Sequence, residues 1–274
     1  MSYIKLVNFE VKRVFKLFLA LSAVVALLQI ATAILSAVRF KKNARQPLQS
    51  ETLSLEAYGD YNYAKYTIHN FINEGMFFFS IVLAIAMLII YMFFIWYRDW
   101  FGKSSFIYRL LMLPTARSNV YFAKLTTILL FAFCLLSVQI VLIEIAQLII
   151  KAIIPAQLLQ VNVMAVTSLN ILSILIPQSV SQFLLSYGLG MVLVAIIFTA
   201  ILFERSFHLK GIFLAGFYSS LSLALLFAPL IMNEFINYFF YENELLLLVG
   251  FTALIVFAIA VYLANYLLNR KINV

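Results

Sequence analysis

The chain has 274 residues, of which 65% are hydrophobic and 11% charged, and its mean hydropathy is +1.04. A soluble domain carries about a quarter charged residues, so this composition excludes a soluble globular protein and indicates a chain solvated by lipid. The net charge of +8 is distributed between apolar stretches, which favours a membrane-orientation signal over nucleic-acid binding. The single cysteine, Cys134, excludes a disulfide framework or a cysteine-rich metal cluster.

The N-terminal region predicts an interfacial helix followed by a membrane span. Residues 3–16 place apolar and basic side chains on different helical faces, which is typical of a helix lying on the cytosolic membrane surface. Residues 17–38 are uncharged and long enough to cross the bilayer. Ser22, Gln29 and Ser36 belong to one small and polar stripe of this span, which predicts either contact with another helix or a water-filled path.

Residues 39–75 are polar and predict a loop on the outer side, before a second span at residues 76–97. The loop begins with a basic group, Arg39, Lys41, Lys42 and Arg45, that opposes the positive-inside rule. Its tyrosines predict either an interfacial aromatic belt or a vestibule for a substrate.

Residues 98–124 form a basic connection between the second and third spans. It holds one acid, Asp99, and the bases Arg98, Lys103, Arg109, Arg117 and Lys124, with an apolar strip between them. This pattern predicts a segment lying along the inner membrane surface, with an extended corner at Leu113-Pro114. Gly102-Lys103-Ser104 lacks the earlier glycine of a phosphate-binding loop, since residue 97 is tyrosine, so we expect no ATP binding by this chain.

The remaining predicted spans are residues 125–150, 180–203, 211–232 and 245–268, with an external, partly buried helix in 155–178. Glu144 and Gln147 lie near the outer end of the third span, where they predict an interfacial network, or alternatively a proton relay. Gly216, Ser219 and Ser220 in the fifth span favour close helix contact.

Together these elements predict an all-α polytopic membrane protein, a single transmembrane domain over residues 1–274 with six spans. The inner segments of this arrangement hold most of the basic residues, which places both termini in the cytosol. Neither a metal-ligand motif nor a nucleophile–base motif is recognisable, so we expect no metal site, no cofactor and no enzymatic activity of the chain's own.

Several features of the basic connection resemble the permease subunit of ATP-binding-cassette exporters of the type-2 class. The second span runs into Asp99 and Gly102-Lys103, Leu113-Pro114 with Arg117 follows, and Lys124 opens the third span. The basic tail, residues 266–274, is also similar to the ending of these subunits.

The resemblance implies the membrane-spanning subunit of an exporter in a bacterial cytoplasmic membrane. Because the implied path is apolar and lined by Ser and Gln with almost no charge, we expect an amphipathic or hydrophobic cargo, such as a membrane-active peptide or antimicrobial. It implies two copies of a separate ATPase that bind ATP and Mg²⁺, and a second permease subunit, most simply an identical one, that meets the chain through its first and fifth spans. The residues implied in coupling to the ATPase are Arg98, Asp99, Gly102, Lys103, Arg109, Leu113, Pro114 and Arg117. Those implied at the dimer or pathway surface are Ser22, Gln29, Ser36, Gly216, Ser219 and Ser220. The alternative function is a membrane scaffold or sensor that binds a ligand through its tyrosine-rich outer loop.

Overall fold

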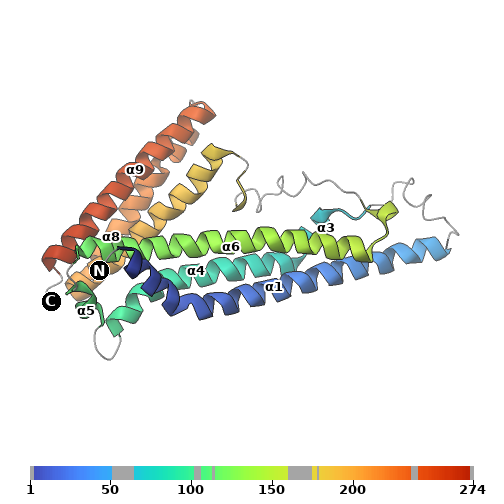
Figure 1. The fold of residues 1–274 in the computed structure, drawn as a ribbon. Coiled ribbons are helices and arrows are strands. Elements are labelled where there is room, and N and C mark those ends of the chain that lie inside the picture. Colours follow the sequence, from blue (N-terminus) through green and yellow to red (C-terminus); the bar gives the residue numbers. More distant parts are fainter. Residues whose placement is uncertain are drawn as a thin grey trace. The chain divides into compact units, whose positions relative to one another are not determined.

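The computed structural model describes residues 3–50, 65–101, 106–112, 115–159, 175–177, 179–235 and 240–271 (Figure 1). Its helices are α1 (Tyr3–Ser50), α3 (Ile68–Ile72), α4 (Gly75–Phe101), α5 (Phe106–Leu111), α6 (Arg117–Ile153), η1 (Ala156–Leu158), α8 (Val180–Phe235), α9 (Glu242–Tyr266) and the π-helical turn η3 (Leu267–Lys271). Within these ranges six helical segments are long and apolar enough to cross a membrane. The predicted helical architecture with six segments of membrane-spanning length is therefore confirmed for the described residues.

Several helices extend beyond the predicted spans. α1 continues past Val38 to Ser50, so the start of the predicted outer loop is helical. α6 begins at Arg117, so the last part of the basic connection forms the first turns of a spanning helix. Of the predicted external helix at 155–178, the structure describes residues 155–159, which include the short turn η1, and residues 175–177.

The chain divides into two compact units. The first unit consists of residues 1–14, 88–130 and 179–274, and the second consists of residues 15–87 and 131–178. Each unit has its own cluster of buried apolar side chains. The division falls within α1, α4 and α6, so each of these helices supplies residues to both units.

Aromatic side chains form the centre of the core of the first unit. The ring of Phe198 on α8 lies edge-on to Trp96 of α4 at 5.6 Å and to Tyr121 of α6 at 5.8 Å. Ile107 and Leu110 of α5 are buried in the same cluster. The described members of the apolar strip predicted in the basic connection, Ile107, Leu110 and Leu111, thus pack against the protein's own core.

α8 contains two predicted spans and folds back on itself between them, as the yellow-to-orange ribbon in Figure 1 shows. The rings of Phe203 and Tyr218 are 5.5 Å apart, whereas 15 residues of straight helix would separate them by about 22 Å. Gly211 lies at the turn, where an added Cβ would be 2.9 Å from the Cα of Glu204. Only a glycine permits this approach of the two backbones. The short loop predicted at 204–210 is therefore a tight helical turn.

In the second unit, Tyr66 joins the segment before α3 to the segment after α6. Its backbone N–H donates to the carbonyl of Leu158 at 2.8 Å, and its buried hydroxyl is 2.8 Å from Ser36 Oγ on α1. Burial raises the pKa of the Tyr66 phenol, the hydrogen bond with Ser36 opposes the shift, and the charge of Glu74 adds to it.

Candidate functional site

Five charged side chains meet in the first unit at one end of three helices. They are Glu10 and Arg13 of α1, Arg98 and Asp99 of α4, and Lys124 of α6. We call these residues the charge cluster. Glu10, Asp99 and Lys124 are at most 2% exposed.

The lysine is the centre of the charge cluster. Lys124 Nζ lies 2.8 Å from Glu10 Oε1, is hydrogen-bonded to Asp99 Oδ2 and donates to the carbonyl of Ile95 at 3.0 Å. It also lies 5.2 Å from the centroid of the Trp96 ring. These contacts use all three ammonium donors, so the charge is buried without an unsatisfied hydrogen.

Two arginines complete the pairing of the carboxylates. Arg98 Nη2 is 2.9 Å from the second carboxylate oxygen of Glu10, and Arg13 Nη1 is 2.8 Å from Oδ1 of Asp99. Both arginines are partly exposed, with 18% and 26% of their side-chain surfaces accessible. Each carboxylate therefore has one buried and one half-exposed base, and the charge cluster keeps an excess of one positive charge.

The charge cluster joins three elements that are far apart in sequence. Removing one partner of a buried pair costs about 3–5 kcal/mol, because the other charge stays buried and uncompensated. At the start of α1, Tyr3 supports the same junction, since its hydroxyl donates to Thr126 Oγ1 of α6 at 3.1 Å. The ends of these helices are thereby held together as one rigid junction.

The end of α4 is also tied to the turn in α8. The Tyr97 hydroxyl donates to Glu204, and the guanidinium of Arg205 lies over the Tyr97 and Phe101 rings at 4.8 and 4.5 Å. α4 ends at Phe101, a few residues before α5 begins. The last turns of α4 therefore contact α1, α6 and α8.

α5 presents one charged side chain outward from this junction. Arg109 is exposed, whereas Ile107, Leu110 and Leu111 on its other side are at most 5% exposed. The predicted coupling residues Gly102, Lys103, Leu113 and Pro114 lie outside the described residues.

The described coupling residues divide into one surface residue and three residues with partners inside the first unit. Arg109 lies on the surface, whereas Arg98 and Asp99 belong to the charge cluster. Arg117 donates to the carbonyl of Leu268 at 2.6 Å, so the first residue of α6 holds the turn after α9. A cation at the carbonyl end of a helix is electrostatically favourable.

The polar stripe predicted on the first span is occupied by contacts inside the second unit. Gln29 Nε2 donates to Gln139 Oε1 of α6 at 2.8 Å and to Ser80 Oγ of α4 at 3.0 Å. Ser36 contacts Tyr66, and Ser22 donates to the carbonyl of Phe18 within its own helix. Of the two predicted roles of the stripe, the contacts of Gln29 and Ser36 are those of helix packing.

The remaining predicted residues lie on helix surfaces. Gly216 and Ser220 of α8 are exposed and Ser219 is half-buried, while an added Cβ at Gly216 would meet no atom within 4 Å. On α6, Glu144 is exposed and Gln147 is half-buried. In the described part of the chain, His, Cys, Asp and Glu side chains do not gather in groups that could hold a metal ion.

The basic group of residues 39–45 is partly explained by its contacts in the second unit. Lys41 Nζ donates to the carbonyl of Ile153, the last residue of α6, at 3.1 Å. Arg39 is 3.6 Å from Glu74. Lys41 thus caps the carbonyl end of α6 and Arg39 pairs with an acid. These structural roles account for two basic residues that the positive-inside rule does not explain.

Sequence reasoning missed Glu10 and Arg13 as members of a site. The signal was present, because Glu10 is the one acid in an otherwise basic amphipathic stretch and Arg13 follows it at helical spacing. What could not be read from spacing was that Asp99 and Lys124 would meet them.

Comparison with models of protein families, with curated protein sequences and with solved structures finds no match to this chain. The resemblance to exporter permeases therefore depends on the short motifs and span layout of the sequence.

Proposed function

We propose that the chain is the membrane-spanning subunit of an ATP-driven exporter, in which a separate ATPase docks at α5 and its neighbouring residues. The observation that carries this proposal is that α5 is packed on the apolar core that contains Trp96, the ring in contact with Lys124 of the charge cluster. A lever must transmit displacement instead of absorbing it, and a helix backed by a buried charge cluster and an aromatic core meets that requirement.

The docking surface is defined by the two sides of α5. Ile107, Leu110 and Leu111 fix the helix to the first unit, and Arg109 supplies a positive charge on the opposite side. A partner with an acidic groove at this position would be recognised through charge and shape. Movement of α5 would then shift α4 and α6 together, because Asp99 and Lys124 are paired.

In this proposal ATP and Mg²⁺ bind to two copies of the ATPase, and a second copy of the chain completes the pathway in the bacterial cytoplasmic membrane. The exposed small residues Gly216 and Ser220 favour a helix contact through the fifth span. The first span contributes less support than expected, since Gln29 and Ser36 already have partners within the chain.

The proposed cargo is amphipathic or hydrophobic. A small hydrophilic ion would need charged or carbonyl ligands within the spans. The Gln29–Gln139 pair, which lies well within the candidate spans, is instead satisfied by mutual hydrogen bonds.

Affinity capture of the full chain from its own cells in mild detergent tests the proposal. We expect an ATPase with its own phosphate-binding loop to co-purify, and the eluate to hydrolyse Mg·ATP. Arg109→Glu should remove both the partner and the activity, whereas Lys210→Glu, an equal charge reversal at an exposed position on α8, should retain them. Capture without an ATPase, or equal capture by both variants, would contradict the proposed docking site.

A further inference from the structure

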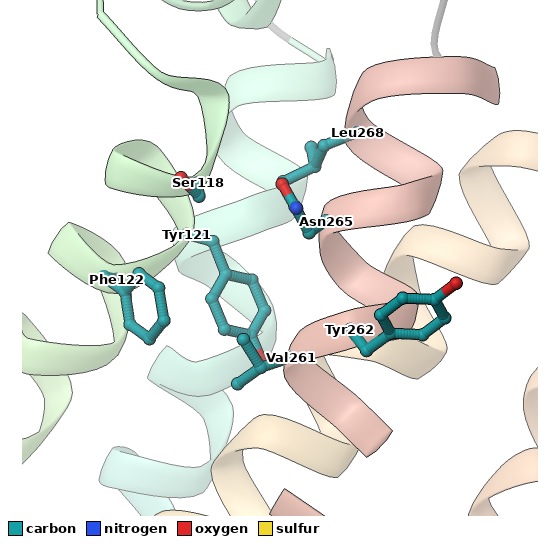
Figure 2. Close-up of a pocket in the computed structure, with 7 residues that line it drawn as sticks. All are labelled: Ser118, Tyr121, Phe122, Val261, Tyr262, Asn265 and Leu268. Carbon is teal, nitrogen blue, oxygen red and sulfur yellow. The ribbon is translucent and has the colours of Figure 1, made fainter. Parts of the chain in front are cut away.

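A hollow lies between the first turns of α6 and the last turns of α9, within the first unit (Figure 2). Its volume is about 240 Å³, and it is lined by Ser118, Tyr121, Phe122, Val261, Tyr262, Asn265 and Leu268. It lies at the same end of α6 as Lys124, where two candidate membrane spans begin and end. If the two helices cross the bilayer as candidate spans, the hollow lies at the level of the lipid headgroups.

The lining has a polar end and an apolar end. Figure 2 shows Ser118 and Asn265 facing each other across the hollow from α6 and α9, while Phe122 and Val261 lie further along the same two helices. Phe122 is four residues from Ser118 on α6 and Val261 is four residues from Asn265 on α9, so the two pairs are about 6 Å apart along the helix axes. The fitting ligand is amphipathic, with its polar group between Ser118 and Asn265.

The charged residues that adjoin the polar end in sequence are all basic. Arg117 precedes Ser118 and contacts the carbonyl of Leu268, a lining residue. Arg270 and Lys271 follow in η3 and are exposed, with their cationic groups over the rings of Tyr266 and Phe207 at 5.7 Å. No acid occurs in residues 115–130 or 250–271, the segments that form the hollow. This charge distribution complements an anionic group.

The size of the hollow suits part of a lipid. Pockets that enclose a drug-sized molecule measure about 300–1,000 Å³, so a hollow of 240 Å³ holds a headgroup and the first methylenes of a chain. Tyr262, 72% exposed at the edge of the hollow, has an amphipathic ring of the kind that stays at the headgroup level. The rest of the lipid would stay in the bilayer.

From the cavity, its polar end and the surrounding bases, we infer that this hollow is a binding site for a glycerophospholipid with an anionic headgroup. The phosphate lies between Ser118 and Asn265, near the three bases, and the proximal acyl chain packs against Phe122 and Val261. This site does not depend on the proposed exporter function, and its test does not involve the ATPase.

The test is native mass spectrometry of the purified, delipidated full chain with added phosphatidylglycerol or phosphatidylcholine. We expect one retained phosphatidylglycerol and weaker phosphatidylcholine binding. Asn265→Trp fills the hollow from an exposed position and should weaken phosphatidylglycerol binding by about tenfold or more. Asn269→Trp is the matched control, because it breaks the same Asn269–Asn265 hydrogen bond of 2.8 Å but does not line the hollow.

A second variant tests the charge without touching the lining. Each base near a membrane surface is worth about a fivefold change in affinity, so Arg270→Gln with Lys271→Gln should lower phosphatidylglycerol binding well beyond that factor and leave phosphatidylcholine unchanged. Equal binding of both lipids by the parent chain would overturn the anionic specificity. Unchanged binding by Asn265→Trp would overturn the location, and displacement of the lipid by millimolar inorganic phosphate would show an anion site instead of a lipid site.

Discussion

Substitutions in the charge cluster should change stability in an order set by which charges remain. In Lys124→Met, Glu10 keeps Arg98 and Asp99 keeps Arg13, so each carboxylate retains one base within 2.9 Å. We therefore expect a cost at the lower end of the range for breaking buried pairs, about 3 kcal/mol.

Asp99→Asn should cost more, although it preserves volume. It leaves three bases with the single acid Glu10, and the nearest remaining carboxylate oxygen to Arg13 is 4.0 Å away. The cluster then carries two uncompensated positive charges in a site where Lys124 is 0% exposed. We expect a cost at the upper end, about 5 kcal/mol.

The double variant Lys124→Met with Asp99→Asn should be less damaging than the sum of the two. Glu10 and the two half-exposed arginines then remain, and the buried positive charge that Asp99→Asn alone leaves in excess is removed with the lysine. A shortfall of about 1–3 kcal/mol from additivity is expected for residues in direct contact.

Detergent-denaturant titration followed by tryptophan fluorescence measures these free energies, because Trp96 is buried against Lys124. Lys210→Met, at an exposed site, is the control and should change stability by less than about 0.5 kcal/mol. If the two costs add to within about 0.5 kcal/mol in the double variant, or if Lys124→Met is more damaging than Asp99→Asn, the reasoning is wrong.

Three further predictions concern the turn of α8 at Gly211, the exposed face of α8 at Gly216, and the buried hydroxyl of Tyr66. Gly211→Ala should lower the melting temperature strongly, because its Cβ would lie 2.9 Å from the Cα of Glu204. Gly216→Ala should not lower it, because its Cβ would meet no atom within 4 Å. Equal changes in melting temperature for the two variants would refute the tight turn. Gly216→Leu should leave the monomer stable but shift the oligomer toward monomer in light scattering, and an unchanged oligomer would exclude this contact. The raised pKa of Tyr66 means that the folded state keeps its phenol protonated where the unfolded state ionises, so stability is fully present below about pH 10 and is lost at higher pH. Tyr66→Phe should lower stability at neutral pH by about 1 kcal/mol and flatten the alkaline decline, and an identical decline would show that another group titrates.

The spans could be predicted from the sequence because they depend on local composition. An uncharged stretch of membrane length has few alternatives to a helix in lipid, so residues such as 76–97 and 245–268 were placed correctly as helical. The helix ends were less predictable. α1 passes through Arg39 and Lys41, and the partners of these bases, Glu74 and the Ile153 carbonyl, lie far away in sequence.

The site could be predicted only in part, for the same reason. The excess of basic residues in 98–124 was apparent, and so was the apolar strip that now anchors α5. Spacing could not separate the bases that face outward, such as Arg109, from Lys124, which is fully buried. That distinction depends on Glu10, which pairs with Lys124 although the two residues are far apart in sequence.

The side of the membrane on which α5 lies decides whether a cytosolic ATPase can reach it. A Cys134→Ser background with a single cysteine at Arg109 or at Lys65, both exposed, allows labelling of intact cells with a membrane-impermeant maleimide. We predict that Lys65→Cys reacts in intact cells and that Arg109→Cys reacts only after permeabilisation. Reaction of Arg109→Cys in intact cells, with Lys65→Cys protected, would contradict both the topology and the proposed docking of an ATPase.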